Sequence, residues 1–171
     1  MQKKCLRPYS LRATYFALMT LLVIALTSVT SLRAMPDEED GLTSAEKESL
    51  SKTKDPEQKL KIYIDIAGHR MKELIQLAAK QDKENTPKAV KGYQTAISGA
   101  EECAVGAKDD SKSSRKMVGT LYRVLQNYNA ALVRAMEKTT DEFRPQIEAA
   151  FNVSTGIQQG MSVRAERYGI K

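Results

Sequence analysis

Apolar residues recur along this chain at spacings of three and four, which is the periodicity of amphipathic α-helices. Four stripes carry the spacing: Leu60, Ile64, Ala67, Met71, Leu74 and Ala78; Val90, Tyr93, Ile97, Ala100 and Ala104; Val118, Leu121, Leu125, Tyr128, Leu132 and Ala135; Phe143, Ile147, Ala150, Ser154, Ile157 and Met161. No stretch shows the alternation of a strand bounded by turn residues. Four helices joined by short loops predict an all-α fold, an up-down antiparallel four-helix bundle.

Helix-capping residues precede the stripes. Thr43-Ser-Ala-Glu46 has the pattern of a capping box and predicts a short additional helix that ends near Lys54. Asp55-Pro56 and Thr86-Pro87 each join a capping residue to a proline at the first helical position, so they predict the starts of the first two long helices. Asp110 or Ser111 is the expected cap of the third.

The fourth stripe has the weakest helix pattern. Pro145 lies near its start, but Gly156 and Gly160 fall inside it. Each glycine costs about 1 kcal/mol relative to alanine in a helix interior. Together with the short helix, the four stripes place the helical-bundle domain at residues 43–171.

The first 34 residues have the order of a secretory signal. Basic residues at positions 3, 4, 7 and 12 precede an uncharged stretch from Ala13 to Leu32, and Ser31 or Ala34 offers a small residue for cleavage. Because this stretch is about as long as a membrane-spanning helix, the alternative is an uncleaved anchor, residues 13–32. An acidic linker, 35–42, follows. Both alternatives place the domain outside the cytoplasm, in the periplasm or the extracellular space.

Charge argues against a nucleic-acid partner once the leader is set apart. The whole chain carries 27 Lys and Arg against 21 Asp and Glu, and its first 34 residues hold five of the basic residues and none of the acidic ones. The remainder has 22 basic and 21 acidic residues, a net charge of +1. A high isoelectric point would otherwise suggest binding to a polyanion.

Few residues suited to catalysis or to metal binding occur in the domain. The domain has one histidine, His69, and one cysteine, Cys103. These are too few for the ligands of a structural zinc site or a di-iron bundle, and the Cys-x-x-Cys-His motif that attaches haem is absent from the sequence. We expect no cofactor. A turn centred near Asn85 would bring Cys103 within one helical turn of His69, so a reactive Cys–His pair is one hypothesis. Burial of Cys103 on a helix face of small residues is the other.

The third helix carries a basic segment. No acidic residue lies between Asp110 and Glu137, whereas Lys112, Arg115, Lys116 and Arg123 are basic. These four residues are candidates for a face that docks an anionic partner, such as a lipid head group or an acidic polymer, and a solvated helix face is the alternative.

Polar residues also lie near the middle of this helix: Tyr122, Asn127, Tyr128 and Asn129. They could line a small polar pocket or an interface. Burial of the tyrosines with hydrogen-bonded hydroxyl groups would account for the same residues.

Three segments carry a resemblance to known families. The leader, the Asp55-Pro56-Glu57 start and the stretch Lys59–Leu77 resemble exported bacterial helical-bundle domains of unknown function, and Leu42-Thr43 with Glu46 is similar to short motifs of periplasmic, Spy-like helical chaperones. The resemblance implies a helical domain of the cell envelope.

These observations predict an exported, non-enzymatic protein that binds or scaffolds through its surface in the cell envelope. Its expected partner is an envelope protein or an anionic surface, with membrane contact through the N-terminal segment only if that segment is uncleaved. The alternative is a small enzyme or cofactor-binding bundle that uses His69 and Cys103.

Overall fold

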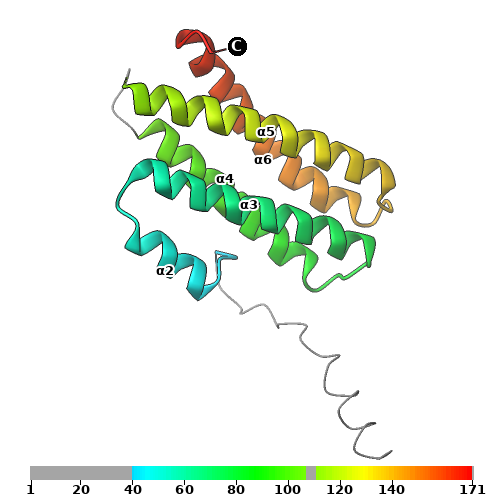
Figure 1. Ribbon diagram of the computed structural model, residues 1–171. Helices are drawn as coiled ribbons and strands as arrows, with labels where there is room; N and C mark the ends of the chain where they lie inside the picture. Colours follow the sequence, from blue (N-terminus) through cyan, green and yellow to red (C-terminus); the bar gives the residue numbers. More distant parts are fainter. Residues whose placement is uncertain (1–39, 107–110, 171) are drawn as a thin grey trace, which may run out of the picture. The chain divides into compact units, whose positions relative to one another are not determined.

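Five helices make up the described part of the chain, residues 40–106 and 111–170 of a computed structural model (Figure 1). They are α2 (Ser44–Lys52), α3 (Pro56–Ala79), α4 (Thr86–Val105), α5 (Lys112–Lys138) and α6 (Arg144–Arg167). No strand occurs among these residues, so the predicted all-α bundle with a short extra helix is confirmed. The predicted signal segment and the predicted linker up to residue 39 lie outside the described residues.

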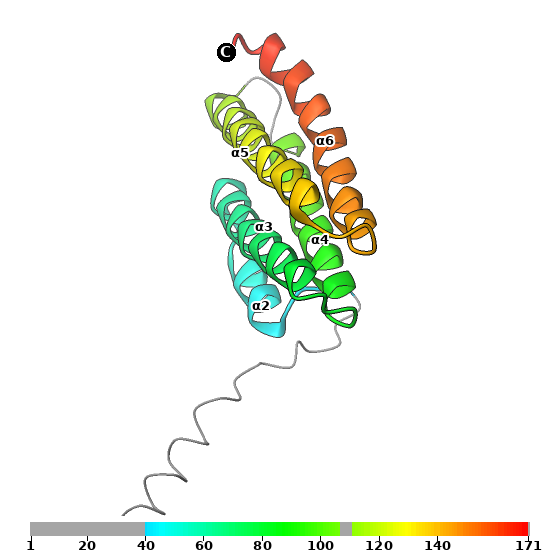
Figure 2. The same cartoon turned by 90° about the vertical axis from the view of Figure 1, so that its right-hand side faces the viewer.

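Two antiparallel hairpins of helices form the bundle. α3 packs most extensively on α4, and α5 packs most extensively on α6. The hairpins then pack on each other, with α3 against α5 and α4 against α6, so that the four helices form two layers (Figure 2). α4 also contacts α5, and α2 packs against α3.

The predicted apolar stripes form the core. Every residue of the second and fourth stripes is buried, including Ser154, and in the other two only Ile64 and Tyr128 remain partly exposed. The largest completely covered side chains are Tyr93 and Phe143. Because Cys103 is a free thiol, no disulfide contributes to the described domain, and burial of apolar surface at about 25 cal/mol per Å² supplies its main stabilisation.

Three of the predicted helix caps are confirmed. The Thr43 hydroxyl accepts a hydrogen bond from the Glu46 N–H at 3.2 Å, and the Glu46 carboxylate accepts one from the Thr43 N–H at 2.7 Å, which completes the capping box. Asp55 caps α3 by accepting from the Glu57 N–H, and Ser111 caps α5 by accepting from the Ser114 N–H. Each cap satisfies a backbone donor that the helix leaves unpaired.

The start of α4 differs from the prediction. Thr86 was expected to be the cap, but it is the first helical residue, it is fully buried, and its hydroxyl donates to the Asp82 carbonyl. The unpaired backbone donors of this turn bind the Asp82 carboxylate instead, which accepts hydrogen bonds from the N–H groups of Glu84 and Asn85 at 3.1 and 3.0 Å. A further hydrogen bond from the Asn85 side-chain amide is the largest cause that lowers the pKa of Asp82.

Residues 40–42 belong to the bundle, although the sequence placed them in the linker. The Thr95 hydroxyl donates to the Asp40 carbonyl at 2.8 Å, and Leu42 is buried. Gly41 adopts a φ of 73° and lies so close to α4 that a Cβ atom on Gly92 would be 2.6 Å from the Gly41 carbonyl oxygen. Two glycines in contact therefore let the chain pass directly over α4 before α2 begins.

Candidate functional site

Cys103 lines a hollow of about 280 Å³ at the open end of the α3–α4 hairpin. Residues of both helices and of the segments beside them surround it: Lys54, Pro56, Lys59, Tyr63, Gly99, Glu102, Cys103 and Gly106. The ring of Tyr63 lies over Gly99, where a Cβ atom would be 2.4 Å from it. Cys103 is half-buried, whereas its small neighbours Ala100 and Ala104 are covered, so the thiol lies at the edge of that helix face.

The surroundings of Cys103 disfavour its thiolate. Burial raises the pKa of the thiol, the Lys59 ammonium opposes this by lowering it, and the Glu102 carboxylate raises it further. Burial also raises the pKa of the Tyr63 hydroxyl, with contributions from Cys103 and Glu102. A reactive cysteine requires the opposite arrangement, a positive environment that favours the thiolate.

The structure does not bring His69 to Cys103. Two close contacts set the register of the hairpin: Tyr63 lies against Gly99, and Arg70 lies against Gly92. His69 is therefore level with Tyr93, about ten residues from the level of Cys103, or about 15 Å along the helix axis. His69 is exposed and does not line the hollow.

The predicted turn position explains this difference. A turn centred near Asn85 would have placed His69 level with residue 100, but α3 ends at Ala79 and the register centres the turn several residues earlier. The expected proximity of His69 and Cys103 is thus wrong, because each residue of shift in the turn moves two antiparallel helices past each other by two residues.

Cys103 is expected to be alkylated by iodoacetamide more slowly near neutral pH than the cysteine of a short unstructured peptide. Its raised pKa leaves less thiolate, so the rate should continue to rise with pH beyond the ordinary pKa of cysteine. Replacing Lys59 with glutamine removes the opposing charge and should slow the reaction further. Peptide mass spectrometry separates Cys103 from Cys5, and a rate above that of the unstructured peptide would contradict the prediction.

The four basic candidates share one face of α5. Lys112, Arg115, Lys116 and Arg123 are all exposed, and their spacing of three, four and seven residues aligns them along the first half of the helix. Arg123 is additionally fixed, because its Nε donates to the Gly119 carbonyl at 3.2 Å. The predicted docking residues are thus brought together.

The end of α6 and the N-terminus of α3 complete this face. The Arg115 guanidinium lies 5.6 Å from the centre of the Tyr168 ring, and Ile170 packs over Gly119. Lys116 forms an ion pair with Glu57, and this hydrogen bond is the largest cause that lowers the pKa of Glu57. The aromatic partner at position 168 was missed in the sequence, since Arg115 and Tyr168 meet only when α6 folds back along α5.

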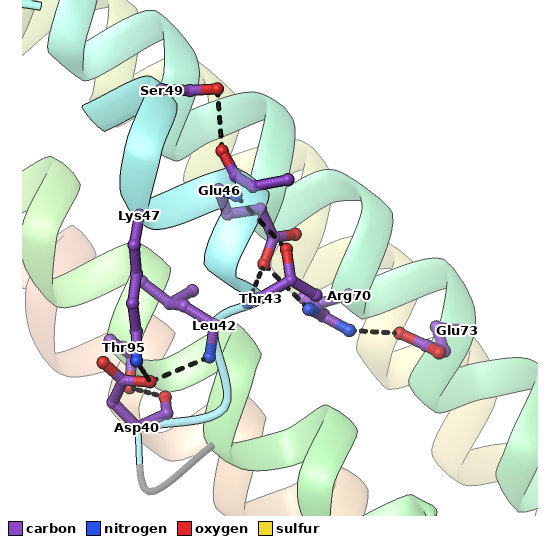
Figure 3. Close-up of polar contacts among 10 residues, drawn as sticks. Asp40, Leu42, Thr43, Glu46, Lys47, Ser49, Arg70, Glu73 and Thr95 are labelled. Carbon is purple, nitrogen blue, oxygen red and sulfur yellow. Dashed lines mark hydrogen bonds and ion pairs between the residues drawn. The ribbon is translucent and has the colours of Figure 1, made fainter. Parts of the chain in front are cut away.

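A buried arginine joins α2 to the bundle and was also missed. Arg70 is 3% exposed, its Nη2 donates to Glu46 at 2.8 Å, and its Nη1 donates to Glu73 at 3.0 Å (Figure 3). The Glu46 oxygen that binds Arg70 also accepts the Thr43 N–H of the capping box. Arg70 lies three residues after Ala67 and four before Leu74, so its place on the apolar face was a signal that could have revealed it.

Among residues 40–106 and 111–170, no group of three or more His, Cys, Asp or Glu side chains is placed to hold a metal ion. None of the helices in this part of the chain is both long and apolar enough to span a membrane. Comparison of the chain with protein-family models, with curated proteins and with solved structures found no match.

Proposed function

We propose that this protein is an exported, non-enzymatic helical bundle that binds an anionic surface of the cell envelope, formed by acidic lipid head groups. The observation that carries the proposal is the alignment of Lys112, Arg115, Lys116 and Arg123 on one exposed face of α5. The leader in the sequence and the resemblance to exported helical-bundle domains support its location in the envelope.

The charge around this face supports attraction to an anionic surface. Arg164 and Arg167 lie in the last turn of α6, at the same end of the bundle as the first turns of α5. By sequence, the four basic residues of α5 and the two arginines of α6 outnumber the acidic residues beside them, which are Glu57, Glu166, Asp109 and Asp110, and Glu57 pairs with Lys116. Each basic residue close to an acidic lipid surface contributes about 1 kcal/mol to binding.

Rigid support of the basic side chains adds to the argument. The Arg115 guanidinium lies over the Tyr168 ring at the end of α6, and the Arg123 guanidinium donates to the Gly119 carbonyl of α5, so both groups are held in place. A surface whose charges are already positioned loses less conformational entropy on binding. These contacts support a binding face in place of a set of independently moving side chains.

Reversing two of these charges is expected to weaken binding to vesicles that contain phosphatidylglycerol at least tenfold. The double variant Lys112→Glu and Arg123→Glu removes two favourable contributions of about 1 kcal/mol each and adds two repulsive ones. Co-sedimentation with vesicles measures the effect at low salt, and about 0.1 M salt should weaken binding of the unchanged protein because it shortens the Debye length to about 10 Å.

The matched control reverses two exposed lysines at other positions, Lys72 on α3 and Lys91 on α4. This variant has the same net charge as the first and should bind within about twofold of the unchanged protein if the α5 face is the binding surface. Equal losses in both variants, or equal binding to vesicles of uncharged phosphatidylcholine, would refute the proposal.

A further inference from the structure

A second hollow, of about 260 Å³, lies between α5 and α6. Tyr122 of α5 and four residues of α6 line it: Thr155, Gln158, Gln159 and Ser162. Each of these side chains is uncharged, and each ends in a hydroxyl or a primary amide. The hollow beside Cys103, in contrast, is lined by two lysines and a glutamate.

One wall of this hollow is held in position from the bundle interior. Asn129 is 8% exposed and donates through its side-chain amide to the Gln158 carbonyl oxygen. This hydrogen bond turns the oxygen of Gln158 inward and leaves the two amide hydrogens as donors. Support of a binding residue by a buried neighbour is the arrangement that preorganises a site.

Two polar atoms at this place lack partners. Thr155 Oγ1 and Asn129 Oδ1 are buried, and neither has a hydrogen-bond partner in the described part of the chain. Buried polar groups are normally hydrogen-bonded, so each exception calls for an explanation. Thr155 lines the hollow, but its Oγ1 atom is covered, so a ligand hydroxyl reaches it and supplies the missing hydrogen bond only when a neighbouring lining side chain moves aside.

Two glycines of α6 lie beside the hollow and leave the surface there without side chains. Gly156 and Gly160 are exposed, and no atom lies within 4 Å of the position of a Cβ on either. They follow Thr155 and Gln159 directly in the sequence, so the surface beside the hollow has no side chain at these two positions. A ligand seated in the hollow could therefore extend sideways over α6.

We propose that this hollow binds a neutral, polyhydroxylated ligand, one ring of a saccharide. Hydroxyl and amide groups can each donate and accept, as sugar hydroxyls do, and Tyr122 adds an aromatic ring to the lining, against which the C–H groups of a sugar can pack. A charged ligand finds no opposite charge among the lining residues and would lose hydration without compensation. The volume is below the roughly 300–1,000 Å³ of sites for drug-sized ligands, which suits a single ring.

Saturation-transfer NMR of the purified chain with methyl glucoside and N-acetylglucosamine tests this proposal. Both neutral sugars should receive saturation, while glucuronate and glucosamine, which carry opposite charges, should receive much less. Thr155→Val keeps the side-chain shape without the hydroxyl, and Gln158→Leu removes the amide; each should weaken sugar binding about tenfold. Circular dichroism verifies that both variants remain helical.

The matched control is Gln76→Leu, which removes an exposed amide on α3 and should leave sugar binding unchanged. Three outcomes would overturn the proposal: no saturation of either neutral sugar, sugar binding that survives both hollow variants, or binding of a neutral serine peptide in place of the sugars. None of the residues involved belongs to the basic face of α5, so vesicle binding and sugar binding can fail independently.

Discussion

Replacing Glu46 with alanine is expected to lower the free energy of unfolding by about 3 kcal/mol. Glu46 and Glu73 are the carboxylates bound to the guanidinium of Arg70, whose side chain is only 4% exposed. Removing one partner leaves part of a buried positive charge uncompensated, which costs far more than losing an exposed ion pair. The substitution also opens the capping box at Thr43. Urea unfolding followed by circular dichroism measures the change.

Two variants separate the causes of this loss. Glu48→Ala removes a carboxylate from the same helix, but Glu48 is exposed and pairs with the exposed Lys52 one turn away, so the expected change is within about 0.5 kcal/mol. Glu46→Gln keeps an acceptor for the Thr43 N–H and removes only the charge. If Glu46→Ala and Glu48→Ala unfold at the same urea concentration, the buried ion pair does not stabilise the bundle.

Local patterns explain why so much of the fold was predictable. The periodicity of the apolar residues depends on one helix at a time, and a capping residue acts within three residues of itself. The stripe from Phe143 to Met161 was correct to the last residue, including Ser154, although Gly156 and Gly160 weaken its helical pattern. Burial on the bundle side overrides the low helix propensity of those two glycines.

Contacts between distant residues explain what was missed. The register of α3 on α4 depends on which residues of the facing helices allow a close approach, and Tyr63 over Gly99 sets it. The sequence around Tyr63 and the sequence around Gly99 do not show that these two residues contact each other. The bond between Arg70 and Glu46 joins residues 24 positions apart, across the turn between α2 and α3. Both errors concern pairing, which periodicity does not specify.

The candidate sites also differ in whether their residues lie on one helix or on two. The basic face of α5 could be read from the sequence, because Lys112, Lys116 and Arg123 recur at helical spacing on one element. Only part of the polar hollow was predictable from the sequence. Tyr122 and Asn129 lie among the polar residues near the middle of α5, whereas Thr155 and Gln158 look like ordinary polar positions of α6. Only the packing of α6 on α5 shows that Asn129 supports Gln158. A site on two helices needs their register before its residues can be named.

Replacing Gly92 with alanine is expected to lower the free energy of unfolding by about 2 kcal/mol. The added Cβ atom would lie 2.6 Å from the Gly41 carbonyl oxygen and 3.1 Å from Arg70 Nε. The first neighbour is backbone and the second belongs to a buried side chain held by two carboxylates, so neither can move without breaking other contacts. The segment from Asp40 to Leu42 should lift from α4, and hydrogen exchange of its amides should accelerate.

Replacing Gly156 with alanine should instead raise the free energy of unfolding. Nothing lies within 4 Å of a Cβ atom there, and alanine is favoured over glycine by about 1 kcal/mol in a helix interior, so Gly156→Ala should unfold at higher urea than the unchanged protein. The two variants add the same methyl group to helices of similar length, so their difference of about 3 kcal/mol isolates the effect of contact from that of helix propensity. A stabilising Gly92→Ala would mean that the segment from Asp40 to Leu42 does not pack on α4. It would also contradict the steric need for glycine at position 92, since the three atoms nearest to an added Cβ belong to Gly41 and Arg70.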